Sequence, residues 1–208
     1  MMKAVRKGAV VVARTLITTL GLLSLGTVGA FAQEGHSQAS TSQRQSQLTP
    51  AQGELLRIVR ESTERFQNVS VAEGEGYGLL FGCVTGPDSG AMGLHFVKQA
   101  FLKTPPLTAT GEIDPTRPEI VIYEPVHGGG LRLIGADYLV FADAWDKDHP
   151  GNPPQLFGQL FHYFESPNRF GLPAFYTLHV WAWKENPNGA FVNWHPNVSC
   201  QPFSGQTP

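Results

Sequence analysis

Apolar residues recur at the spacing of a helix in the segment that follows Thr49. Thr49 is a typical N-cap residue, Pro50 suits the first turn, and the glycines at 74 and 76 mark an end. The apolar positions are Leu55, Leu56, Val59 and Phe66. Other positions carry charged residues, namely Arg57, Arg60, Glu61 and Glu64, so the pattern predicts an amphipathic helix that lies on a sheet.

From Tyr77 onward the apolar spacing shortens to two, which predicts strands. Strands are expected over residues 77–84, 92–97, 119–124, 131–141 and 175–183. A polar, proline-rich loop is expected over 142–155 and a short helix over 155–164. These elements predict an α+β domain, with one N-terminal amphipathic helix and an antiparallel sheet that is either curved or a partly closed barrel.

The first 32 residues have the pattern of a secretory signal peptide. Basic residues precede an apolar stretch, and Ala30-Phe31-Ala32 matches the triplet that signal peptidase accepts. An uncleaved anchor is the alternative, because residues 15–32 form an uncharged stretch close to the shortest that spans a bilayer. Residues 33–48, rich in Gln and Ser, predict a flexible tether, and 49–208 a single globular domain. We therefore expect an exported protein, periplasmic or secreted, without stable membrane insertion after cleavage.

Charge and cysteine content fit this interpretation. Without the signal segment the chain has 11 basic and 17 acidic residues, so no basic stripe remains that would indicate nucleic acid as a partner. The two cysteines, Cys83 and Cys200, predict one disulfide in an exported protein. A reactive thiol pair is the alternative, but the C-x-x-C spacing that tunes thiolates is lacking.

Three of the predicted strands each place one polar group among apolar neighbours. His95 lies between Leu94 and Phe96, Glu124 shares a face with two isoleucines, and His179 lies within an aromatic row. Along that row, alternation places Phe175, Thr177, His179, Trp181 and Trp183 on one face. Two imidazoles and one carboxylate form the ligand set of open zinc sites and of non-heme iron(II) sites. The hypothesis is one transition metal ion, whether zinc, iron or copper, held by His95, Glu124 and His179.

Other residues extend or compete with this hypothesis. His127, His162 and His195 are additional candidate ligands, and Trp194 is a candidate for the rim of a pocket. With a metal, the domain is either a hydrolase or an oxidoreductase, and the sequence alone does not establish that it is an enzyme. The alternative is a metal-free module in which Trp194, His195 and the 142–155 loop bind a small molecule or glycan. A structural protein of the cell envelope, without a site, is a third interpretation.

Four strings in the mature domain together resemble a family of uncharacterised bacterial exported proteins. They are MGLHF at 92–96, IVIYEP at 120–125, LHVWAWKENPNG at 178–189 and FVNWHPNVSC at 191–200. The family has W-N-P where this chain has Trp194-His195-Pro196, so His195 departs from the shared string. The resemblance implies an exported single domain and transfers no chemistry.

Overall fold

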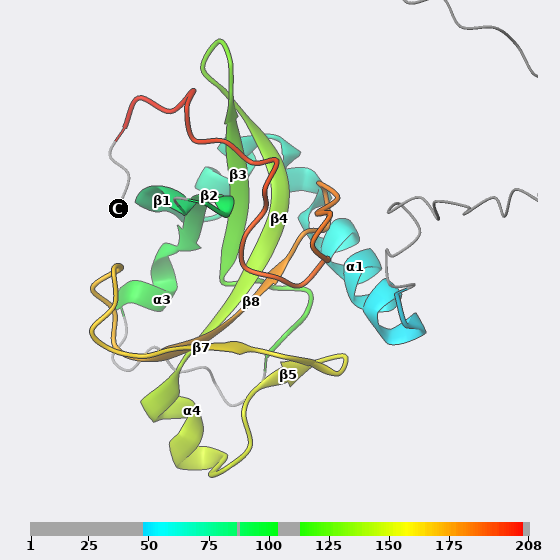
Figure 1. The fold of residues 1–208 in the computed structure, drawn as a ribbon, viewed down its shortest axis with the longest axis vertical. Helices are drawn as coiled ribbons and strands as arrows, with labels where there is room; N and C mark the ends of the chain where they lie inside the picture. The colour runs from blue at the N-terminus through cyan, green and yellow to red at the C-terminus, as the bar shows by residue number, and fades with distance from the viewer. Residues whose placement is uncertain (1–47, 87, 104–112, 206–208) are drawn as a thin grey trace, which may run out of the picture. The chain divides into compact units, whose positions relative to one another are not determined.

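The structure is a computed structural model that describes residues 48–86, 88–103 and 113–205 (Figure 1). The predicted signal peptide lies outside these residues, as does the predicted tether apart from its last residue. Within the described part of the chain, no helix has the length and apolar character needed to cross a bilayer.

The N-terminal helical segment begins where the sequence provides a cap. Helix α1 spans Pro50–Thr63, and the side chains and backbone N–H groups of Thr49 and Gln52 form a reciprocal capping box. A 3-10 helix, η2 (Glu64–Gln67), and a short helix, α2 (Val69–Gly74), follow. Leu55, Leu56 and Val59 are buried, so one side of α1 packs on the sheet.

Six strands form one curled antiparallel sheet in the order β1-β2-β3-β4-β8-β7 (Figure 1). The strands are β1 (Tyr77–Gly86), β2 (Gly90–Lys98), β3 (Ile120–Val126), β4 (Gly130–Phe141), β7 (His162–Phe164) and β8 (Phe175–Val180). Helix α3 (Gln99–Lys103) follows β2. The α+β class and the curved antiparallel sheet are confirmed, and the sheet is a half-barrel, because β1 and β7 are its two edges.

The two faces of the sheet are covered by different parts of the chain. On β4 and β8, Ala136, Tyr138, Leu178 and Val180 pack against α1. Because side chains alternate along a strand, Asp137, Thr177 and His179 lie on the opposite face. We call the first the helix face and the second the site face. Val198, from the C-terminal segment, packs on the site face with Ile120, Ile122 and Trp181.

Two of the expected elements are wrong. The expected 142–155 loop begins with helix α4, Ala142–Asp148. The expected helix over 155–164 is instead a hairpin, β5 (Gln155–Leu156) and β6 (Gln159–Leu160), followed by β7. Phe157 and Gly158 both have positive φ, 49° and 78°, which is the geometry of a tight hairpin turn. The turn reverses the chain where the apolar spacing had suggested a helix.

Trp181 and Trp183 do not share a face, which corrects a further expectation. Strand β8 ends at Val180, and the Ala182 N–H donates to the Val180 carbonyl in a tight turn. Trp181 packs on the site face, whereas Trp183 packs on the helix face and donates from Nε1 to Thr63. Alternation holds only while the backbone remains extended, and here it does not.

Cys83, on β1, is bonded to Cys200 of the C-terminal segment, with the Cα atoms 5.8 Å apart. The predicted disulfide is therefore confirmed. It closes a loop of 117 residues, which fastens the C-terminal segment to the edge of the sheet.

Candidate metal centre

The register of the sheet brings three buried polar side chains together on the site face. His95 on β2 is paired with Ile122 on β3, and Ile120, two residues earlier on β3, is paired with Asp137 on β4. Asp137 is paired in turn with His179 on β8. Directly paired residues point to the same face, so four adjacent strands contribute to one site. Ile120 and Ile122 of β3 lie between His95 on β2 and the polar residues on β4 and β8.

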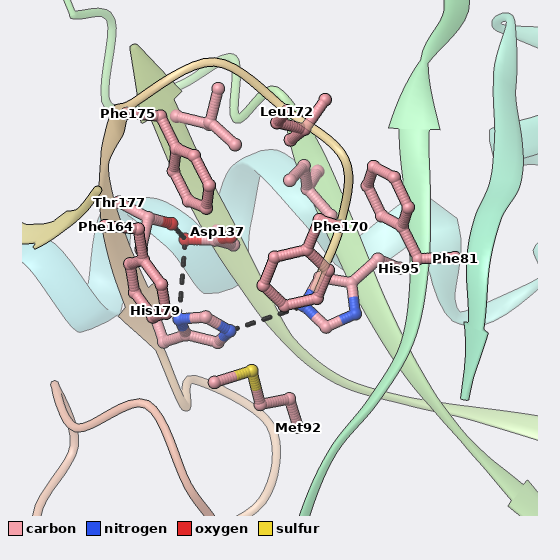
Figure 2. A pocket seen from close by; sticks show the side chains of 12 residues that line it. Phe81, Met92, His95, Asp137, Phe164, Phe170, Leu172, Phe175, Thr177 and His179 are labelled. Atoms are coloured by element: carbon pink, nitrogen blue, oxygen red, sulfur yellow. Dashed lines mark hydrogen bonds and ion pairs between the residues drawn. The ribbon is translucent and has the colours of Figure 1, made fainter. Parts of the chain in front are cut away.

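The three side chains are close enough to share one ion (Figure 2). His95 Nε2 lies 3.4 Å from His179 Nε2, and His179 Nδ1 lies 3.6 Å from Asp137 Oδ1. One ligand atom can be chosen from each residue so that all three lie within 4.8 Å of one another. The residues are 5%, 2% and 2% exposed for His95, Asp137 and His179. The cluster can therefore hold a metal ion away from bulk water.

The separation of the two imidazoles suits a metal. Two nitrogens bound to one tetrahedral zinc ion, with bonds of about 2.0 to 2.1 Å, stand about 3.3 to 3.4 Å apart. His95 Nε2 and His179 Nε2 already have that separation, 3.4 Å. Asp137 is held nearby by Thr177, whose hydroxyl donates to Oδ1 over 2.5 Å. A carboxylate oxygen of Asp137 lies within 4.8 Å of a nitrogen of each imidazole, so it can complete the set if the side chain moves toward the ion.

Hydrogen bonding fixes which nitrogens are free to bind an ion. His95 Nδ1 lies 3.2 Å from the Gly93 carbonyl, which only accepts, so the proton of the neutral ring is on Nδ1. His179 Nδ1 faces the carboxylate of Asp137, whose Oδ1 lies 3.6 Å away. A proton on Nδ1 suits these surroundings as well. Both Nε2 atoms then carry a lone pair, and they face each other.

Neither proton placement satisfies His179 without a cation. With the proton on Nδ1, two lone pairs meet between the imidazoles. With the proton on Nε2, the Nδ1 lone pair faces the oxygen of Asp137 instead. Even a proton on Nδ1 would gain little, because 3.6 Å is too long for a strong hydrogen bond to Asp137. His179 Nδ1 has no hydrogen-bond partner in the described residues. A metal ion bound to both Nε2 atoms removes the conflict, because each lone pair then becomes a ligand.

Burial keeps both imidazoles in the neutral form that metals bind. Loss of solvation lowers the pKa of His95 to about 4, and the neighbouring His179 adds to this decrease. Loss of solvation lowers the pKa of His179 to about 3, and the nearby His162 adds to this decrease. Burial also raises the pKa of Asp137 to about 6, which leaves it ionised at neutral pH. Neutral imidazole and ionised carboxylate are the protonation states that coordination requires.

Glu124, the carboxylate expected in the site, does not meet the two histidines. It is buried on β3, but it lies two residues beyond Ile122 toward the β3–β4 hairpin. There its Oε1 accepts from Arg132, its direct partner on β4, and its Oε2 lies 2.5 Å from Lys184 Nζ. Two cations therefore neutralise Glu124. Asp137 is the carboxylate that lies beside the two histidines, where the hypothesis had placed Glu124.

Asp137 was missed although the same signal marks it. It lies within Ile-Gly-Ala-Asp-Tyr-Leu-Val, a polar group in an apolar strand like His95 and His179. Alternation shows which residues share a face of one strand, but the register between strands decides which of them meet. The register also includes a bulge, because the partner of β3 shifts by one residue between Ile122 and Tyr123.

The remaining candidates are not members of the cluster. His127 is exposed in the β3–β4 turn, and exposed His162 interacts through Nε2 with the Phe191 carbonyl, 3.2 Å away. His195 is fully buried, accepts from the Asn197 N–H at Nδ1 and stands edge-on to Trp181. Trp194 packs against Gly86, and it is not among the residues that line the cavity in front of the cluster.

Comparisons with protein-family models, with curated proteins and with solved structures find no match to this chain.

A second buried acid, Glu119, lies outside the cluster, just before β3. It accepts from the Leu139 N–H over 3.3 Å, and burial raises its pKa to about 7. A carboxyl group whose pKa is higher in the folded protein than in the unfolded chain stabilises the fold while it is protonated. That contribution is complete below about pH 4.5 and is lost as the pH rises through 7.

We expect Glu119→Gln to flatten the dependence of stability on pH. Between pH 5 and pH 8 the free energy of unfolding of the wild type should fall by about 1 to 2 kcal/mol relative to the variant, a value reduced because Glu119 is half-buried. Urea unfolding at both pH values measures this difference. Glu64→Gln, at an exposed position in η2, is the control. Parallel pH profiles for wild type and Glu119→Gln would show that the acid is not buried as described.

Proposed function

We propose that the protein is an exported metalloenzyme with one transition metal ion held by His95, His179 and Asp137. The observation that carries the proposal is the pair of imidazole Nε2 atoms, 3.4 Å apart and buried, with each Nδ1 directed at an oxygen acceptor. Such an arrangement is unfavourable for the protein alone and suits a cation. The adjacent carboxylate offsets part of the charge of a divalent ion.

The surroundings of the site favour a redox metal over hydrolytic zinc. A zinc hydrolase needs a group that takes a proton from water and polar groups that orient its substrate. Of the described residues that line the cavity beyond the three ligands, only Thr177 is polar, and its hydroxyl already donates to Asp137. Two histidines and one carboxylate, leaving coordination positions open, are the ligand set of non-heme iron(II) oxygenases. We infer an oxidoreductase that uses iron, with copper as the other redox metal the ligands accept.

Three features of the chain support the proposal that the protein is exported. The Cys83–Cys200 disulfide is a bond that persists in oxidising compartments. The predicted signal peptide and the resemblance to exported bacterial proteins point to the same location, periplasmic or secreted. Expression with the natural N-terminus, followed by N-terminal sequencing of the exported form, tests this part. Cleavage after Ala32 is the expected result, and an intact N-terminus in the cytoplasm would contradict it.

Metal binding is tested by reconstitution of chelator-treated protein. Incubation with iron(II) under anaerobic conditions, and separately with copper or zinc, should yield about one ion per chain after gel filtration. Elemental analysis measures the ratio. Less than about 0.1 ion per chain for all three metals would contradict the proposal.

Bound metal should also stabilise the fold. A ligand present at about 1,000 times its dissociation constant adds about 4 kcal/mol to the free energy of unfolding if it binds only the folded chain. We therefore expect the midpoint of thermal unfolding to rise on addition of iron(II) and to fall again on chelation. Magnesium is the control, since it prefers oxygen ligands and should leave the midpoint unchanged. An equal shift with magnesium would indicate binding elsewhere.

A further inference from the structure

The three proposed ligands line an apolar cavity on the site face (Figure 2). The other residues that line it are Phe81, Met92, Ile120, Leu139, Phe164, Phe170, Leu172, Phe175 and Thr177. None of these described residues is a lysine or an arginine. The described lining itself therefore supplies no positive charge, and the Arg169 guanidinium lies 6.0 Å from the centre of the Phe170 ring.

Phenylalanines form the mouth of the cavity. Phe81 lies in a bulge of β1, where two residues are inserted between the pairs Leu80–His95 and Cys83–Leu94. Its φ of 66° lies in the left-handed region, which costs a non-glycine residue about 1 kcal/mol or more. The bulge brings the Phe81 ring edge-on to Phe170, 5.4 Å away, and Phe170 packs in turn against Phe175. The backbone is thus held in a strained conformation that places an aromatic ring over the site.

The cavity is small. Its volume is about 30 Å³. One buried water needs at least about 10 to 15 Å³ by the same measure. There is room for an ion and one small molecule, but not for a substrate of many atoms.

We propose that this cavity, which we call the phenyl chamber, admits a small neutral diatomic molecule to the metal and excludes hydrated anions. The proposal rests on the proposed metal site. Dioxygen belongs to this class, and it is the co-substrate that iron(II) sites of this ligand type use. An anion would lose its hydration among aromatic and aliphatic side chains, a cost of several kcal/mol that no lysine or arginine among the described lining residues offsets.

The test uses the full mature protein loaded with iron(II) under anaerobic conditions. Its iron content is measured first. Nitric oxide then serves as the neutral diatomic probe, and the electron paramagnetic resonance signal of the iron–nitrosyl unit measures its binding. Azide is the anionic probe, and it competes with nitric oxide for the iron. We expect nitric oxide to bind at one per iron and azide to compete only weakly. In Phe170→Ala, which opens the mouth, azide should compete at a concentration at least about tenfold lower.

Two further variants keep the test decisive. Leu172→Ala opens the same mouth from a neighbouring position, should Phe170→Ala fail to fold. Phe157→Ala removes a ring from the β5–β6 hairpin, away from the chamber lining, and should behave as wild type. If iron binds but azide competes equally well in the wild type and in both mouth variants, the chamber proposal is overturned and the metal site stands. If iron does not bind to the wild type, both are overturned.

Discussion

Replacing His179 with alanine is expected to reduce the metal content of reconstituted protein from about one ion per chain to less than 0.1. His179 faces His95 through one nitrogen and Asp137 through the other, so its loss separates the remaining two groups. His95→Ala should have the same effect, because it removes the other nitrogen of the pair. Elemental analysis after gel filtration measures both variants, and far-ultraviolet circular dichroism verifies that they are folded.

The matched control is His162→Ala. His162 lies on β7, the strand next to β8, and its alternative role as an additional ligand is tested at the same time. Its side chain is exposed and bonds to a backbone carbonyl outside the cluster. We expect full metal content in this variant. Full content in folded His179→Ala, or loss in His162→Ala alone, would place the ion elsewhere.

Asp137→Asn is expected to weaken metal binding by at least about 100-fold, whereas Glu124→Gln should change it less than about threefold. The first change keeps the shape of the side chain but removes its negative charge beside His179. Because the variant keeps the shape of the side chain and loses only its charge, a loss of metal affinity reflects lost coordination and not altered packing. Groups that only orient a ligand contribute about 10- to 100-fold, so a larger loss indicates that Asp137 binds the ion directly. Competition with a fluorescent chelator measures both affinities.

Glu124→Gln should instead affect stability. Its carboxylate is 5% exposed and paired with Lys184 and Arg132, which would lose their partner. Because both cations retain contact with solvent, we expect a loss of about 1 to 3 kcal/mol in the free energy of unfolding, below the cost for a fully buried pair. If Glu124→Gln weakened metal binding more than Asp137→Asn, the original choice of carboxylate would be right and the present one wrong.

Much of the fold followed from local patterns. The period of two predicted five of the six strands of the sheet, whereas β7 falls in the expected helix. Two cysteines in a chain expected to be exported predicted the disulfide. The errors occurred where a single backbone conformation overrides a pattern. The positive φ at Phe157 and Gly158 turns an apparent helix into a hairpin, and the end of β8 at Val180 moves Trp183 to the other face.

The membership of the buried cluster was only partly predictable. A histidine in the middle of an apolar strand must find a partner, and this argument identified His95 and His179 correctly as groups that meet. The choice between Glu124 and Asp137 depended on cross-strand register, which one sequence does not contain. The cations that neutralise Glu124 come from a neighbouring strand and from a segment 60 residues further along the chain.

Diffraction from crystals of the iron-loaded protein at the iron absorption edge tests the central claim most directly. We predict one strong anomalous peak on the site face, within about 2.0 to 2.2 Å of Nε2 of His95, Nε2 of His179 and a carboxylate oxygen of Asp137. A peak at Glu124 or at the exposed histidines, with the His95–His179 pair left without one, would contradict it.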